Sequence, residues 1–283
     1  MTRADSTYIF DNSDEHEAER LAGIQAAFDA GTFRHLSDLG VGEGWRCLEV
    51  GAGAGSVAKW LCQRVGEKGS VVATDIDTIL LDGLDLPNLE VRRHDLQTED
   101  LPKGEFDLVH TRLVLIHLPA REEILRRMAD ALAPGGWLLV EDLSLDGATT
   151  STRRGTVALK ALLTTLKTMF EAHGADVRFA RRVPVLFNRL GLVEVGAEGR
   201  VVVLIGGSDS VAWLLPTVDR IQERLAGEGS GPSRAKAAFE RVPALRRAAD
   251  AQLNRLRRLL DDPGFAVFLP AMVATWGRRP PRP

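Results

Sequence analysis

Hydrophobic and polar residues between positions 46 and 141 alternate between two kinds of segment. Short apolar runs, typical of buried strands, are separated by amphipathic stretches, typical of helices. The expected strands span residues 46–50, 71–74, 89–92, 106–110 and 137–141, and the expected helices span residues 56–65 and 121–132. A turn is expected at Pro134-Gly135-Gly136. Strands joined by helical crossovers form a parallel sheet with helices on both faces, so the pattern predicts an α/β fold.

The segments on either side of this alternation are mostly helical. Helical patterns cover residues 14–39, 153–171 and 184–190, two later stretches between 214 and 260 separated by Gly227–Ser233, and strand-like patterns cover residues 193–205 and 265–276. About 60 residues of helix are thus inserted between two late strands. If the first of these strands runs parallel to the central ones, its carboxyl end opens on the ligand edge, and the inserted helices form a lid over that edge.

This interpretation divides the chain into five parts. They are an N-terminal helical cap segment (1–40), a Rossmann-like cofactor-binding core (41–145), a helical segment with a late sheet strand (146–207), a helical lid insertion (208–263), and a final strand with a frayed tail (264–283). The first residues lack the apolar region of a secretory signal, and no apolar run approaches the ~18 residues of a membrane span. We therefore expect a cytoplasmic protein without a membrane partner.

Composition narrows the function further. The net charge is −3, and basic residues are not interleaved with aromatic ones, so a nucleic-acid partner is not expected. The two cysteines, Cys47 and Cys62, form neither a disulfide framework nor a zinc motif. Because no His, Asp or Glu cluster has ligand spacing, no metal site is expected. These features leave a small-molecule substrate as the favoured partner, and a homodimer stays open.

A glycine-rich turn is the strongest candidate for a ligand site. The sequence Gly51-Ala52-Gly53-Ala54-Gly55 follows one predicted strand and opens the next helix. Glycines remove the Cβ atoms that would keep a ligand from the backbone, and a helix amino terminus offers unpaired N–H groups. Asp75 stands 22 residues after Gly53, at the end of the next strand, where a carboxylate can accept hydrogen bonds from a ribose. The glycines could alternatively form only a tight turn, but the combination favours a nucleoside site.

Two residues beside the turn indicate which nucleoside is bound. The dinucleotide motif requires a glycine where this chain has Ser56. Glu49 precedes the turn, and a carboxylate there disfavours a pyrophosphate but tolerates a cationic ligand. A nicotinamide-dependent oxidoreductase is therefore the weaker alternative.

Five segments in order carry a family resemblance. Residues 40–145 resemble the class I S-adenosylmethionine-dependent methyltransferases through EVGAGAGS, VVATDID, RHDL, FDLVHTRLVLIHLP and LAPGGWLLVED. The resemblance implies a seven-stranded, mainly parallel Rossmann-like sheet with an added helical lid, and S-adenosylmethionine as the cofactor. The rest of the chain resembles, less specifically, the variable substrate-binding parts of bacterial small-molecule methyltransferases.

The resemblance also implies a set of cofactor-binding residues. Gly51, Ala52 and Gly53, with Glu49 beneath them, would adjoin the methionyl part, and the Thr111 carbonyl would contact its amine. Asp75 would hold the ribose, Ile76 would pack on the adenine, Asp95 would accept a hydrogen bond from its amino group, and the Leu96 N–H would meet a ring nitrogen. Tyr8 and Arg20 are candidates for the methionyl carboxylate. Alternatively, Asp95 caps a turn, Tyr8 is a packing residue, and Arg20 is a solvated helix residue.

Methyl transfer is an in-line displacement, and positioning alone can supply up to ~7–11 kcal/mol of its barrier. His117 and Asp142 are the candidate bases, because both are expected just beyond strand carboxyl ends. Alternatively, His117 packs in a loop and Asp142 caps the next segment. His110 is expected in the core. Arg112 could orient an anionic acceptor.

The favoured hypothesis is a methyltransferase of specialised metabolism that acts on a small, hydrophobic acceptor. Apolar stripes in the late helices, with Trp213 as a candidate lining residue, could form its pocket, although most such stripes form helix–helix core. The main alternative is an enzyme of this fold that binds S-adenosylmethionine but catalyses a cyclisation or rearrangement without methyl transfer. A non-catalytic binding protein is a third. The acceptor atom stays open.

Overall fold

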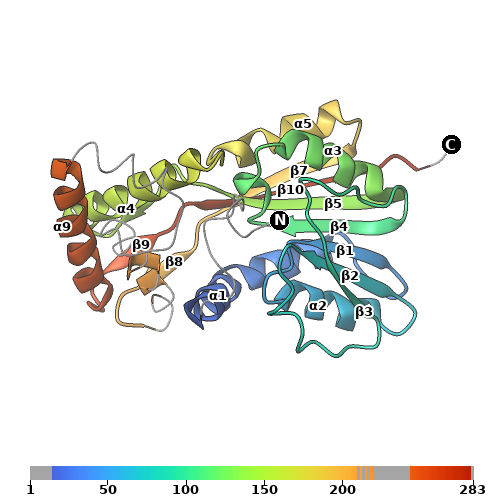
Figure 1. Cartoon of the computed structure of the whole chain (residues 1–283), viewed down its shortest axis with the longest axis horizontal. Helices are drawn as coiled ribbons and strands as arrows, with labels where there is room; N and C mark the ends of the chain where they lie inside the picture. Colours follow the sequence, from blue (N-terminus) through green and yellow to red (C-terminus); the bar gives the residue numbers. More distant parts are fainter. Residues whose placement is uncertain (1–14, 209–210, 212–213, 216, 220–242, 282–283) are drawn as a thin grey trace. The chain divides into compact units, whose positions relative to one another are not determined.

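The computed structural model describes residues 15–208, 211, 214–215, 217–219 and 243–281 (Figure 1). Tertiary contacts group the chain into two compact units. The sheet unit comprises Phe28–Leu143, Arg178–Arg200 and Met272–Pro283, and the helical unit comprises Met1–Ala27, Ser144–Val177 and Val201–Ala271. Helix α1 (Glu15–Asp38) contributes its first half to the helical unit and its second half to the sheet unit.

A seven-stranded sheet forms the centre of the sheet unit, with the strand order β3-β2-β1-β4-β5-β10-β7 (Figure 1). The strands are β1 (Arg46–Val50), β2 (Ser70–Asp75), β3 (Leu89–Arg93), β4 (Phe106–Arg112), β5 (Leu132–Ser144), β7 (Val193–Arg200) and β10 (Ala271–Arg278). The pairs β3–β2, β2–β1, β1–β4 and β4–β5 are parallel. The predicted Rossmann-like, mainly parallel α/β sheet is therefore confirmed.

Strand β10 runs against the central strands. The Gly135 N–H donates to the Arg279 carbonyl at 3.0 Å, and the Arg279 N–H donates to the Gly136 carbonyl at 2.8 Å. The end of β10 thus lies beside the start of β5. Because β7 pairs antiparallel with β10, β7 runs in the same direction as β5. The first part of the strand expected over residues 193–205 is thus parallel to the central strands, and the lid itself stays a prediction.

Helices cover both faces of this sheet because successive strand residues point to opposite sides. Cys47 and Leu108 join a buried cluster with residues of α1 and α2 (Ser56–Val65), whereas their neighbours Leu48 and Val109 join a second cluster. The second cluster includes residues of α3 (Arg121–Ala131) and α5 (Val183–Arg189). Figure 1 shows these two helix pairs on opposite sides of the sheet. Two short 3-10 helices, η2 (Leu115–His117) and η3 (Phe179–Arg181), complete the unit.

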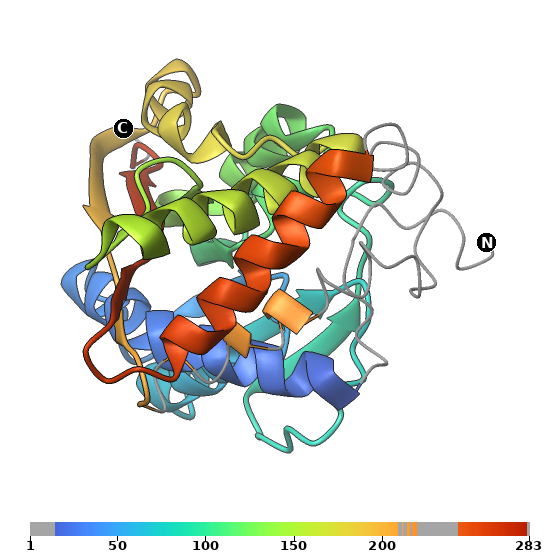
Figure 2. The same ribbon diagram turned by 90° about the vertical axis from the view of Figure 1, so that its left-hand side faces the viewer.

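The helical unit is built from α4 (Arg153–Ala172), α9 (Pro243–Leu260) and a small sheet. Helices α4 and α9 pack against each other (Figure 2). The Thr152 side chain caps α4 by accepting the Gly155 N–H at 3.0 Å. The antiparallel sheet has the order β6-β9-β8 and comprises β6 (Thr149–Thr150), β9 (Ala266–Phe268) and β8 (Val203–Ile205).

Three predicted elements are different in the structure. The strand expected over residues 193–205 is two strands, β7 and β8, in different sheets. The strand expected over residues 265–276 is likewise divided into β9 and β10, and the break contains Pro270, which has no N–H to donate to a sheet. The turn expected at residues 134–136 lies within β5 as an irregularity, since Leu132 pairs with Phe106 and Trp137 with Leu108. Most of the helix expected from residue 214 to 225 lies outside the described residues.

Candidate functional site

The glycine turn between β1 and α2 has a backbone that requires glycine. Gly51, Gly53 and Gly55 have φ angles of 72°, 55° and 79°, in the left-handed region. An added Cβ at Gly51 would also overlap the Val114 side chain. The Gly51 and Ala52 N–H groups donate to the Thr74 carbonyl at 2.8 and 3.0 Å. The turn is therefore fixed against the end of β2, and the Val114 side chain fills the space beside Gly51.

Asp75 lies directly beside this turn. Its Oδ2 accepts the Gly53 N–H at 2.9 Å, and its Oδ1 accepts the Asp77 N–H at 3.2 Å. Burial raises the pKa of the Asp75 carboxyl, although these backbone N–H groups oppose the shift. The following residue, Ile76, is 38% exposed. The two features that the sequence spacing predicted to meet are thus in contact at the carboxyl edge of the sheet.

A buried group of charged side chains lies on the neighbouring strands. His110 on β4 stands between two carboxylates: its Nδ1 is 2.6 Å from Glu49 Oε2 on β1, and its Nε2 is 3.3 Å from Glu141 Oε2 on β5. The side chains of all three are at most 3% exposed. Burial alone would lower the pKa of His110, but the two carboxylates outweigh it and raise that pKa to about 9. The two carboxylates therefore favour the protonated imidazolium form of His110, and we call these residues the Glu–His–Glu cluster.

The carboxylates of the cluster respond to burial differently. Burial raises the pKa of Glu49, and the hydrogen bond from His110 only partly offsets this. Burial also acts to raise the pKa of Glu141, but bonds from His110 and Thr32 lower it overall. Sequence analysis placed His110 in the core, which is confirmed by its complete burial, but missed the cluster. The cluster could have been suspected from the sequence, because Glu49, His110 and Glu141 each lie near the carboxyl end of an otherwise apolar expected strand.

From Glu141 the polar contacts continue to α1 and return to the glycine turn. Thr32 donates to Glu141 Oε2 at 2.5 Å, and Arg112 donates to Thr32 Oγ1 at 2.8 Å and to Asp29 Oδ1 at 2.7 Å. Ser56, where α2 begins, donates to the same Asp29 oxygen at 3.1 Å. The charge of Arg112, predicted to orient an acceptor, is thus already paired with a carboxylate of this chain.

The two candidate bases lie near each other in the fold. Asp142, near the end of β5, accepts the Ile116 N–H at 3.2 Å through Oδ2. Its Oδ1 is buried and has no hydrogen-bond partner among the described residues. Burial raises the pKa of Asp142 to about 8. His117 follows Ile116 at the end of η2 and is half-buried. Asp142 therefore holds η2, whose last residue is His117, by accepting a backbone N–H from it.

Asp95 and Leu96 form a turn after β3. Asp95 Oδ1 accepts the Gln97 N–H at 2.9 Å, which is the capping contact given above as its alternative role. Leu96 is buried, and Arg127 of α3 donates to the carbonyls of Leu96 and Glu99. This arginine holds the turn against α3.

Of the four remaining predicted residues, the structure describes two. The Thr111 hydroxyl donates to the Val50 carbonyl at 2.9 Å, joining the ends of β4 and β1. Arg20 lies in the first half of α1, in the helical unit, and is buried, so the alternative of a solvated helix residue is wrong. Tyr8 and Trp213 lie outside the described residues. Within the described ranges, no group of His, Cys, Asp or Glu side chains could hold a metal ion, and no helix is long and apolar enough to cross a membrane.

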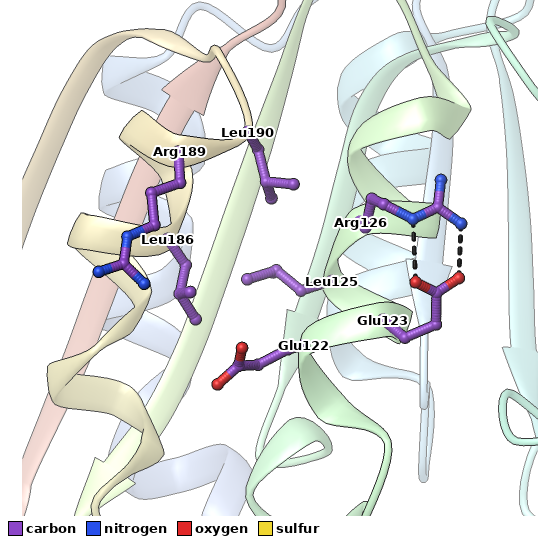
Figure 3. Close-up of a pocket in the computed structure, with 7 residues that line it drawn as sticks. All are labelled: Glu122, Glu123, Leu125, Arg126, Leu186, Arg189 and Leu190. Carbon is purple, nitrogen blue, oxygen red and sulfur yellow. Dashed lines mark hydrogen bonds and ion pairs between the residues drawn. The ribbon is translucent and has the colours of Figure 1, made fainter.

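A surface hollow lies elsewhere on the sheet unit (Figure 3). It is lined by residues of α3 and α5 and the residue after α5, namely Glu122, Glu123, Leu125, Arg126, Leu186, Arg189 and Leu190. These helices cover the face opposite to α1 and α2, and none of the predicted site residues lines the hollow. It is therefore separate from the glycine turn.

A family model described as "Methyltransferase domain" matches residues 13–180. The chain belongs to this methyltransferase family. The match includes the glycine turn, Asp75, the Glu–His–Glu cluster and Asp142, and it confirms the resemblance to the class I S-adenosylmethionine-dependent methyltransferase superfamily.

Individual relatives match over part of their length. Methyltransferase str2 of Strobilurus tenacellus is 30% identical over 172 residues, which are 60% of this chain and 61% of that protein. The ubiquinone/menaquinone biosynthesis C-methyltransferase UbiE of Laribacter hongkongensis is 34% identical over 118 residues, 38% of this chain and 47% of that protein. The chain thus spans less than two thirds of these curated relatives.

Solved structures share the fold. The YcgJ protein of Bacillus subtilis has a TM-score of 0.53 at 13% identity, covering 88% of this chain and 97% of that one. At this identity the similarity supports the Rossmann-like architecture and carries no information about the substrate.

Proposed function

We propose that the chain is an S-adenosylmethionine-dependent methyltransferase acting on a small, hydrophobic metabolite. The observation that carries the proposal is the hydrogen bond between the Gly53 N–H and Asp75, which places an acidic group beside an open backbone turn at the carboxyl edge of a parallel sheet. Family membership supports the choice of reaction.

The residues at this edge fit the cofactor. Asp75 offers a carboxylate to ribose hydroxyls, and the exposed side chain of Ile76 offers an apolar surface to a purine. Val114 fills the space beside Gly51 where a Cβ would stand, and Glu49, which precedes the turn, is proposed to favour a cation. Asp95, Leu96, Ala52, Gly53 and Thr111 are proposed to complete the site, and the roles of Tyr8 and Arg20 stay predictions from the sequence.

When bound, S-adenosylmethionine supplies an electrophilic methyl group, so the chain must orient an acceptor and accept its proton where one is released. Asp142 is suited to the second task because its Oδ1 is buried without a hydrogen-bond partner among the described residues and its pKa is raised to about 8. A carboxylate with a raised pKa is a stronger base than an ordinary one. His117 remains the second candidate, and its neutral imidazole suits the same task.

The proposal of a hydrophobic acceptor rests on the name of one relative and on the apolar stripes in the sequence of the late helices. One relative is named as an enzyme of ubiquinone/menaquinone biosynthesis, and others are named only as methyltransferases. The candidate lining residue Trp213 stays a prediction. No observation favours the cyclisation or rearrangement alternative over methyl transfer.

The test begins with calorimetric titration of the purified chain with S-adenosylmethionine. Incubation with methyl-labelled cofactor and a panel of apolar metabolites should then yield a labelled product. Conversion of an acceptor without label would support the alternative reaction instead. Absence of cofactor binding would overturn the proposal altogether.

A further inference from the structure

One continuous set of polar contacts joins both ends of the glycine turn. At the start of the turn, Glu49 contacts His110, which contacts Glu141. At its end, Ser56 contacts Asp29. The two ends are connected through Thr32, which donates to Glu141, and Arg112, which donates to both Thr32 and Asp29. All of these residues belong to the sheet unit, so the connection does not depend on the other unit.

Stability alone is a weak reason for such a buried arrangement. Removing two carboxylates and an imidazolium from water costs several kcal/mol per ion, and apolar residues of similar volume often stabilise a fold equally well. The cluster nevertheless stands on three neighbouring central strands, where an apolar core would otherwise continue. A role beyond packing is therefore the better explanation for His110.

The strand order indicates which part of the cofactor would meet the cluster. Asp95 follows β3, Asp75 ends β2, Glu49 lies on β1 and His110 lies on β4, and these strands are consecutive in the sheet. If the adenosine is held at β3 and β2, as proposed above, the amino-acid end extends toward β1 and β4. In this strand order, β1 is the first strand that the amino-acid end would reach, and β1 carries the Glu49 carboxylate.

We propose that His110 is a positioning residue that keeps the Glu49 carboxylate ionised and fixed in orientation beneath the glycine turn, so that the site favours the ammonium-bearing end of the cofactor. His110 acts through Glu49 and is not itself proposed to touch the cofactor. Glu141, which accepts a hydrogen bond from Thr32, contacts the imidazolium from the other side. This inference rests on the proposed function.

Two replacements of His110 separate its two contacts. An asparagine amide lies near the position of Nδ1 and can still donate to Glu49, whereas a glutamine amide lies near the position of Nε2 and can reach only Glu141. His110→Gln should therefore weaken cofactor binding more than His110→Asn does. Glu141→Gln leaves the contact with Glu49 in place, removes one carboxylate beside the imidazolium, and should have a smaller effect in the same direction.

Three ligands identify the part of the cofactor that is affected. S-adenosylmethionine and S-adenosylhomocysteine both carry the amino-acid end, whereas 5′-methylthioadenosine retains the adenosine but lacks that end. We expect His110→Gln to weaken binding of the first two about tenfold or more, the range for losing a hydrogen bond to a charged group, and to change methylthioadenosine binding less than about twofold. Thr275→Val is the matched control, because it removes a buried hydroxyl on β10 that has no hydrogen-bond partner among the described residues.

The outcomes are distinct. An equal loss for all three ligands, or no loss for any, would overturn the role of His110, as would a loss confined to S-adenosylmethionine, which would point to the sulfonium. Unaltered methylthioadenosine binding also shows that a variant is folded. If His110 variants do not fold, Glu141→Gln decides by the same comparison of ligands. Failure of the unsubstituted chain to bind any of the three would instead refute the proposed function.

Discussion

Two aspartates at the same sheet edge differ in what surrounds their oxygens. Asp75 accepts two backbone N–H groups, which favour its charged form, although burial still raises its pKa. Asp142 accepts one N–H through Oδ2, and its Oδ1 has no hydrogen-bond partner among the described residues. A carboxylate satisfied by the backbone is suited to holding a ligand, whereas a poorly satisfied one is suited to accepting a proton. We therefore propose that Asp75 binds the ligand and that Asp142 takes part in proton transfer.

The proton-transfer assignment predicts the pH dependence of the reaction. Because the pKa of Asp142 is raised to about 8, its carboxyl is protonated at lower pH and becomes a base only as the pH rises through that value. With an acceptor that must lose a proton, kcat/KM should increase from pH 6 to 9. Asp142→Asn should lower kcat by roughly 10²–10⁴-fold and remove this increase.

His117→Ala serves as the comparison for Asp142. If His117 is the base, its replacement should abolish the pH dependence instead, and the Asp142 variant should retain it. Cofactor affinity measured by calorimetry should be unchanged in the His117 variant, since that residue is not in the proposed cofactor site. An unaltered pH profile in Asp142→Asn would refute the assignment of the base.

The binding assignment predicts a different result for Asp75. Asp75→Asn removes the charged acceptor proposed for the ribose, so affinity for S-adenosylmethionine and for methylthioadenosine should fall together, by about 10–100-fold. Titration calorimetry of both ligands measures this. The parallel loss contrasts with the selective loss expected for His110→Gln. Retention of either affinity would exclude Asp75 as the ribose-binding residue.

At the scale of elements, the local sequence pattern predicted which helices and strands form, whereas pairing between distant strands determined where the strands end. Helices α2, α3 and α4 follow from apolar residues at helical spacing, and the glycine turn follows from its own sequence. The bounds of β5 depend on its irregular register with β4, which no local pattern contains. The Glu–His–Glu cluster likewise requires β4 to lie between β1 and β5, so the sequence could show its residues only as isolated charges within strands.

The glycine turn allows a test of shape at this scale. Gly51 and Gly104 have similar φ angles of 72° and 71°, but an added Cβ at Gly51 would overlap Val114, whereas Gly104 has no atom within 4 Å of that position. Gly104→Ala should cost only the backbone strain of about 1 kcal/mol. Gly51→Ala should lower the free energy of unfolding further and weaken cofactor binding.

Urea denaturation and calorimetry of the two variants measure these effects. In Gly51→Ala combined with Val114→Ala, the overlap is relieved, so part of the lost affinity should return. Equal effects of the two single alanine variants on both stability and binding would show that the shape of the turn is unimportant.

At the scale of the whole molecule, the sequence predicted the sheet unit better than the helical unit. Strands of the sheet unit recur at short, regular intervals, and each carries its own apolar signal. In the helical unit, β6, β8 and β9 have at most three residues each and are separated by long stretches of chain, so their pairing depends on tertiary contacts. The family match also ends at residue 180, so the family model does not cover β7, β8, α9, β9 or β10.

The buried charges of the sheet unit predict how the stability of the molecule depends on pH. The pKa of His110 is raised to about 9 in the folded chain and lies near 6.5 when unfolded, so the folded state binds the proton more tightly. The resulting stabilisation is complete below pH 6.5 and is lost as the pH rises through 9, by about 3 kcal/mol at most. The raised pKa of Asp142 acts in the same direction between pH 4 and 8. Urea denaturation should therefore show a lower free energy of unfolding at pH 9.5 than at pH 6.5, and His110→Asn should reduce that difference. If the difference persists in full without the imidazole, the cluster does not hold its proton as the geometry indicates.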